Sequence, residues 1–170
     1  MCVCVYLQSS QNRHIVCQFF KESAMSATKG RFDLSDPIVV VRILCGLLFV
    51  PHILFKLNGM DGAAAFFAKA GFDPAYPFLI LAIIAESMSA VGLIFNIATK
   101  WSGLLAAAVM AGATKAVLAM KGAVWLWNLG GIEYNVVWCF LCLVIAIHAW
   151  REEHRTYGRI FLLSPRSVHA

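Results

Sequence analysis

Hydrophobic positions are gathered into four long runs that are separated by short polar stretches. The runs cover residues 37–57, 76–97, 100–120 and 133–150. Each run is close to the ~20 residues that a helix needs to cross ~30 Å of hydrocarbon. Backbone amides must be paired inside lipid, and no strand-length alternation separated by turns is present, so the runs should be helices. The pattern predicts an all-α fold, an integral membrane four-helix bundle.

The stretches outside the four runs divide the chain into three parts. Residues 1–34 are polar and cysteine-rich, so we expect a disordered tail, or an extension of the gene model over residues 1–24 with Met25 as the natural start. Residues 35–150 form the predicted membrane domain, and residues 151–170 form a tail. In the first loop of the membrane domain a short amphipathic pattern predicts a surface helix, ending before a glycine and an Asp-Pro pair. Its residues are 62–70.

Composition and charge add an orientation to this picture. Hydrophobic residues make up 61% of the chain and charged residues 14%, with a mean hydropathy of +0.75, outside the range of ordinary soluble domains. Nine basic residues lie beside the two termini and in the second loop: Arg13, Lys21, Lys29, Arg31, Lys100, Arg151, Arg155, Arg159 and Arg166. The first and third loops carry Lys69 and Lys121. The positive-inside rule therefore predicts both termini in the cytoplasm. Because the basic residues flank spans and form no stripe, we expect no nucleic acid partner.

Ionisable residues inside or beside the predicted spans form a candidate polar cluster. They are Arg42, His52, Lys56, Glu86, Lys115 and Glu133. Glu86 lies near the middle of the second run, where a lone carboxylate costs ~2.5–3.5 kcal/mol on insertion scales, so it should find a partner in the bundle. His52 and Lys56 are four residues apart and share a helix face. We expect the acidic residues of the second and fourth runs to neutralise the basic residues of the first run inside the bundle. The cluster is either a set of such interhelical ion pairs or a polar pocket, open to the outer leaflet, that binds a quinone headgroup or another small polar ligand.

Arg42 and the thiols have alternative interpretations. Arg42 lies near the inner end of its span, where its long side chain either reaches the interface or has a functional role. Cys139 and Cys142 form a CxxC pattern, which is a candidate thiol pair for exchange with a quinone, as in membrane oxidoreductases of the vitamin K epoxide reductase type. Cysteine also packs as a small hydrophobe, and we favour packing here. We expect no metal site, since His148 is two turns from Cys142 and no second ligand pair is suitably spaced.

Several motifs in a fixed order give the sequence a resemblance to a known family. They are "PHILFKL" after Arg42, "AES" around Glu86, "GLIFNIATKWSGLLAAAVM" and "GGIEY". From about Pro37 to Trp150 the chain resembles the DoxX family of small bacterial membrane proteins. The resemblance implies a four-span protein of the bacterial inner membrane, linked to redox and sulfur metabolism. Relatives often carry a histidine late in the third helix, where this chain has Lys115.

These observations lead to competing functional hypotheses. The first is a redox-associated membrane subunit in which His52 and Lys56 hydrogen-bond a quinone carbonyl while Glu86 manages charge or protons, with a soluble or membrane oxidoreductase as partner. The alternative is a non-catalytic scaffold whose tail, residues 151–170, recruits a soluble partner. A small transporter or channel is less favoured, because no broken-helix pairs mark an inverted repeat. A homo-oligomer stays open in each case.

Overall fold

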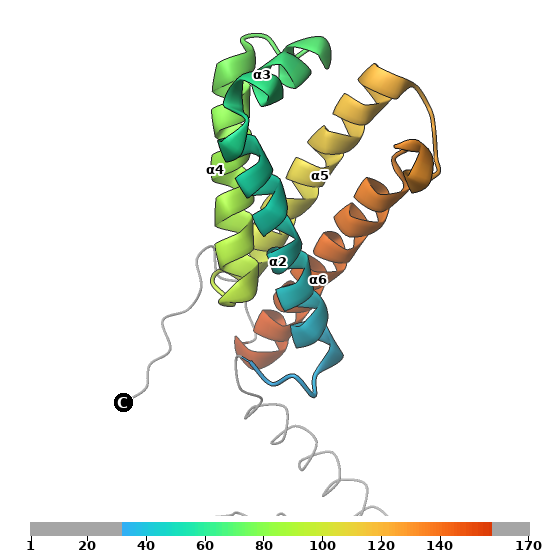
Figure 1. Cartoon of the computed structure of the whole chain (residues 1–170). Coiled ribbons are helices and arrows are strands. Elements are labelled where there is room, and N and C mark those ends of the chain that lie inside the picture. The colour runs from blue at the N-terminus through green and yellow to red at the C-terminus, as the bar shows by residue number, and fades with distance from the viewer. Residues whose placement is uncertain (1–31, 158–170) are drawn as a thin grey trace, which may run out of the picture. The chain divides into compact units, whose positions relative to one another are not determined.

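The computed structural model describes residues 32–157, and this part of the chain is helical and has no strand. The order is α2 (Pro37–Asn58), α3 (Met60–Lys69), α4 (Ala75–Ile94), α5 (Thr99–Lys121), a 3-10 turn η1 (Trp127–Leu129) and α6 (Glu133–Tyr157). Figure 1 shows the four long helices with the short α3 at one end. The predicted all-α class is confirmed. Most of the two predicted tails lies outside the described residues.

Within the described residues, four helices are long and apolar enough to cross a membrane: α2, α4, α5 and α6. Their bounds follow the predicted spans, with two informative differences. α4 ends at Ile94 because Asn96 and Ala98 adopt left-handed backbone angles, with φ of 55° and 46°, which no helix continues. α6 runs past Trp150 to Tyr157, since the charged residues there are good helix formers although they are too polar for the hydrophobic pattern.

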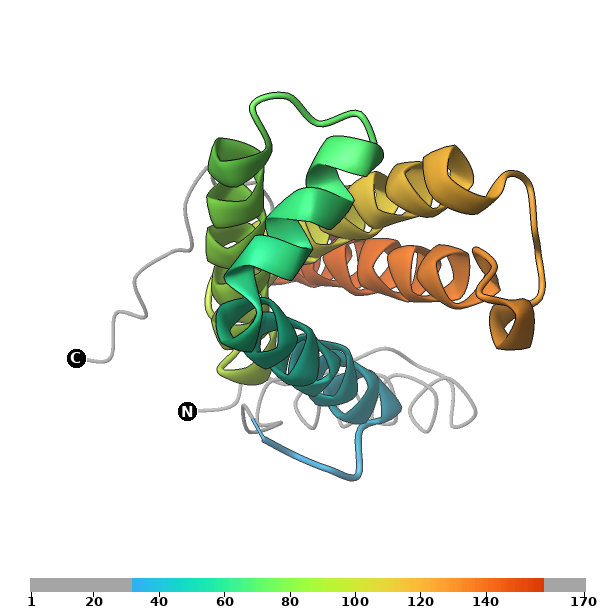
Figure 2. The ribbon, with the colours of Figure 1, turned by 45° about the horizontal axis from the view of Figure 1, so that its top comes forward.

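The spans are arranged as two antiparallel pairs, α2 with α4 and α5 with α6, joined where α4 turns into α5. Figures 1 and 2 both show the pairs lying close together at that turn and diverging toward the end that carries α3. We call these the convergent end and the divergent end. The core shared by the pairs is made of buried residues of all four spans: Cys45, Phe49, Ala90, Leu93, Ala106, Ala107, Met110, Trp138, Cys142 and Ile145.

Small residues bring the helices together on the convergent side. A Cβ atom at Gly46 of α2 would lie 2.8 Å from Ile94 Cγ1 and 3.1 Å from the Ala90 carbonyl of α4. A Cβ atom at Gly103 of α5 would lie 3.0 Å from both the Ala146 Cβ and the Cys142 carbonyl of α6. The backbones of both pairs therefore approach as closely as small-residue packing in membranes allows.

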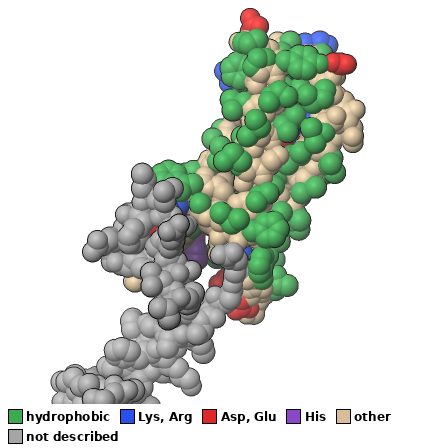
Figure 3. Space-filling model, turned by 90° about the vertical axis from the view of Figure 1, so that its left-hand side faces the viewer, with side chains coloured by type: hydrophobic (Ala, Val, Ile, Leu, Met, Phe, Trp, Pro, Cys, Tyr) green, Lys and Arg blue, Asp and Glu red, His purple; other side chains and the backbone are tan. Residues whose placement is uncertain are grey.

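Large hydrophobic side chains remain on the outside of the spans, among them Leu44, Leu54, Ile84 and Phe140. Figure 3 shows one face on which hydrophobic side chains cover most of the helix length, with charged groups toward the upper end. Contact of such an apolar surface with lipid is favourable, whereas its exposure to water costs free energy. The amphipathic α3 packs through Ala63 and Ala64 on Leu79 of α4, close to the predicted position of the surface helix.

Candidate functional site

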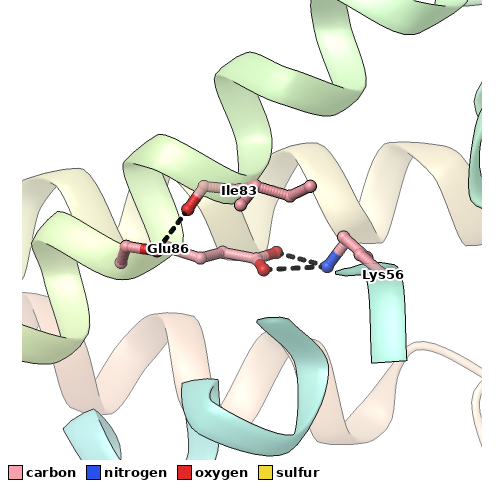
Figure 4. Close-up of polar contacts among 4 residues, drawn as sticks. Lys56, Ile83 and Glu86 are labelled. Carbon is pink, nitrogen blue, oxygen red and sulfur yellow. Dashed lines mark hydrogen bonds and ion pairs between the residues drawn. The ribbon is translucent and has the colours of Figure 1, made fainter. Parts of the chain in front are cut away.

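Lys56 and Glu86 form an ion pair between α2 and α4 on the divergent side. The Lys56 ammonium lies 2.6 and 2.8 Å from the two carboxylate oxygens, and the side chains are 16% and 8% exposed (Figure 4). Each charge neutralises the other, so neither has to enter lipid alone. The sequence predicts that Glu86 is neutralised by basic residues of the first span, and in the structure its partner is Lys56.

His52 lies one helical turn before Lys56 and contacts α6. Its imidazole is 5.6 Å from the Trp138 ring, between ring centroids. Trp138 also packs against Phe49 at 4.5 Å and Tyr134 at 5.4 Å. The Trp138 side chain is buried, yet its indole N–H has no hydrogen-bond partner within residues 32–157. A buried N–H without an acceptor costs ~1–3 kcal/mol, so this donor is a place where a ligand oxygen would be stabilising.

Lys115 and Glu133 make separate contacts. The Lys115 ammonium lies 5.5 Å from the centre of the Phe72 ring, in the loop between α3 and α4. The Glu133 carboxylate accepts a hydrogen bond from the backbone N–H of Trp127 at 3.3 Å, which holds the loop before α6. The structure therefore brings His52, Lys56 and Glu86 near one another and assigns Lys115 and Glu133 to loop contacts.

Arg42 is buried at the convergent end, far along α2 from His52 and Lys56. Its guanidinium donates hydrogen bonds to the carbonyls of Leu93 and, at 3.2 Å, Ile94. These carbonyls belong to the last turn of α4, where the helix itself supplies no donors and where a cation complements the helix dipole. Arg42 thus caps the C-terminal end of α4 and does not lie beside the His52 side chain.

A polar cavity of about 340 Å³ opens beside Arg42 at the convergent end. Its charged and polar lining includes Asp36, Arg42, Asn96, Lys100, His148, Glu152 and Glu153. Within the lining, the Lys100 ammonium lies 2.6 and 2.9 Å from the carboxylate oxygens of Glu153, and the two side chains are 3% and 9% exposed.

Sequence reasoning missed the pair between Lys100 and Glu153. The hydrophobic pattern places Lys100 beside the second loop, where it contributes only to the predicted orientation. Glu153 lies beyond the fourth hydrophobic run. One signal was available: Glu153 follows the buried Ala146 by seven residues, so a helix continuing past Trp150 carries both on one face.

The structure does not direct the Cys139 and Cys142 thiols toward each other, as the CxxC spacing suggests. The Cys139 thiol donates to the Ala107 carbonyl of α5 at 3.3 Å. Cys142 is buried in the core cluster that also contains Cys45 of α2. Across residues 32–157, no group of three or more His, Cys, Asp or Glu side chains is placed to share a metal ion.

Comparisons with known proteins agree with this architecture. The DoxX family model matches residues 38–120. A protein of Bacillus subtilis (strain 168) with the name "Putative oxidoreductase CatD" is 30% identical over 110 residues, which are 65% of this chain and 74% of that protein. No solved structure matches significantly. With its four apolar helices, the chain is a multi-pass membrane protein that belongs to the DoxX family.

Proposed function

We propose that the protein is a quinone-interacting membrane subunit of a redox system. The observation that carries this proposal is the buried Trp138 N–H without an acceptor, beside the imidazole of His52. A quinone is a flat ring with two carbonyl acceptors and a lipid-soluble tail. The exposed imidazole of His52 against the buried ring of Trp138 is an aromatic surface with N–H donors, which has the matching chemistry.

The Lys56–Glu86 ion pair supplies ionisable groups beside the proposed quinone contact. Reduction of a quinone to a quinol takes up two electrons and two protons. Lys56 lies one helical turn along α2 from His52, and its partner Glu86 of α4 has its carboxylate held inside the bundle. In this proposal His52 and Lys56 donate to a quinone carbonyl and Glu86 balances charge or relays protons. Lys115, Glu133 and Arg42 support the helices around this site.

The redox association is also supported by the relative from Bacillus subtilis, whose name is that of an oxidoreductase. Family membership by itself does not assign a reaction, so the inference rests on the site. We propose further that both termini lie in the cytoplasm of a bacterium, as the basic residues beside them favour, and that an oxidoreductase partner exchanges electrons with the bound quinone.

The test is the melting temperature of the purified protein in lipid nanodiscs, with and without a short-chain ubiquinone. We expect the quinone to raise the melting temperature of the wild type by binding the folded state. His52→Ala and Trp138→Phe should lose this increase, because each removes an N–H donor. His148→Ala is the matched control at the convergent end and should keep it. An unchanged wild-type melting temperature, or equal increases in all four proteins, would contradict the proposal.

The scaffold hypothesis depends on the tail that ends the chain. Residues 158–170 lie outside the described part, so recruitment of a partner through this tail stays a prediction.

A further inference from the structure

We propose that Cys45 and Cys142 are a redox-active thiol pair that a quinone oxidises to a disulfide joining α2 to α6. The inference rests on the proposed function for its oxidant. It assigns the redox chemistry to a pair that the sequence spacing does not indicate.

The first support is the position of the two residues in the core. Cys45 and Cys142 come from different helices, are 1% and 0% exposed, and belong to the same buried core cluster. A disulfide needs two cysteines whose side chains point toward each other across a short distance between backbones. The nearest printed contact between α2 and α6 is the pair of rings Phe49 and Trp138, whose centroids are 4.5 Å apart one helical turn from the two cysteines.

The second support is the separation of Cys139 from this contact. Cys139 is directed at a carbonyl of α5, whereas Cys142 lies in the core cluster with Cys45 of α2. The structure therefore makes Cys45, and not Cys139, the thiol neighbour of Cys142.

The third support is the position of the pair relative to the proposed quinone contact. Phe49 lies one turn along α2 from Cys45, and Trp138 lies one turn along α6 from Cys142. These two rings contact each other, so the thiols and the rings are successive layers of the same α2–α6 contact. His52 adds the next layer, about 10 Å of helix rise from Cys45. A quinone held against Trp138 is thus one layer from the thiols.

The step balances without another reactant. Two S–H bonds break and one S–S bond forms, and the two sulfur atoms together give up two electrons and two protons. The quinone takes up both electrons and both protons, and its two carbonyl oxygens become the hydroxyls of a quinol.

The experiment uses full-length protein in nanodiscs, with Cys2, Cys4 and Cys17 replaced by serine so that only the described thiols remain. The reduced protein is incubated without oxygen with a short-chain ubiquinone. Quinol is measured by absorbance, free thiols by maleimide labelling after acid quenching, and the disulfide by peptide mass spectrometry. Cys139→Ala is the matched control for Cys45→Ala and Cys142→Ala, and melting temperatures report that each variant is folded.

We expect the parent protein and Cys139→Ala to lose two thiols, to form the 45–142 disulfide and to yield an equal amount of quinol. Cys45→Ala and Cys142→Ala should do none of these, while quinone still raises their melting temperatures. If quinone raises the melting temperature of the parent but no thiol is consumed, or if Cys139 is the residue required, the inference is overturned and the proposed function stands. If quinone has no effect on melting, both are overturned.

Discussion

Charged side chains have different surroundings at the two ends of the helical unit. At the convergent end Arg42 bonds backbone carbonyls, and Lys100 and Glu153 are almost completely buried against each other. Toward the divergent end the Lys56–Glu86 pair is more exposed, and His52 and Lys115 touch aromatic rings. A buried charge is therefore no sign of a ligand site by itself. Charges whose partners are fixed by packing hold helices together, whereas partly exposed donors beside rings leave contacts for a ligand.

The largest effect should come from breaking the buried pair at the convergent end. Lys100→Ala leaves the Glu153 carboxylate buried without its cation and should lower the free energy of unfolding by about 3–5 kcal/mol. Unfolding in mixed micelles with increasing SDS measures this. The double variant Lys100→Ala with Glu153→Ala should recover much of the loss. An equal or larger loss in the double variant would show that the pair is not the source.

The next effect should come from the close packing of α5 on α6. Gly103→Val should cost about 3 kcal/mol, because the added atoms meet Ala146 and the Cys142 backbone, which cannot move aside. Gly112→Val on the same helix is the control, since a Cβ atom there meets nothing within 4 Å. The same SDS unfolding assay compares them. Similar losses in both variants would mean that valine in α5, and not the contact, is responsible.

Breaking the pair toward the divergent end should cost less. Lys56→Ala is expected to lower the unfolding free energy by about 2 kcal/mol, between the values for exposed and for buried pairs, because its side chain keeps some access to the surface. Unlike Lys100→Ala, it should also abolish the rise in melting temperature with quinone. If Lys100→Ala removed that rise and Lys56→Ala kept it, the comparison between the ends would be reversed.

The smallest effect should follow from Lys115→Met. The ammonium above Phe72 is exposed, and such a cation–π contact contributes about 0.5–1 kcal/mol. The expected loss in the unfolding assay is therefore at most this size. Phe72→Leu, which removes the ring instead of the cation, is the companion variant. A loss as large as that of Lys56→Ala would place Lys115 among the residues that hold the two pairs together.

The spacing of hydrophobic residues predicts the spans well, because the length of each run has to match the thickness of the bilayer whichever helices it packs against. The charges also indicate that Glu86 faces the bundle and is neutralised by basic residues of the first span. They do not indicate that Lys56 and not His52 forms the ion pair, since periodicity gives the face of a helix and not its rotation against another helix. The acceptors of Arg42 exist only because the backbone turns left-handed at Asn96 and Ala98 and ends α4. Sequence spacing likewise pairs Cys142 with Cys139, whereas helix packing pairs it with Cys45.

The positions of the two ion pairs along the chain bear on how the protein is made. Lys56 and Glu86 are 30 residues apart and belong to the first two spans, while Lys100 and Glu153 are 53 residues apart and belong to the last two. Each hairpin therefore contains both members of its own acid–base pair. During synthesis the first hairpin can enter lipid with its ion pair complete before the second hairpin exists. Neither pair therefore exposes an unpaired charge to hydrocarbon while the other half of the chain is being made.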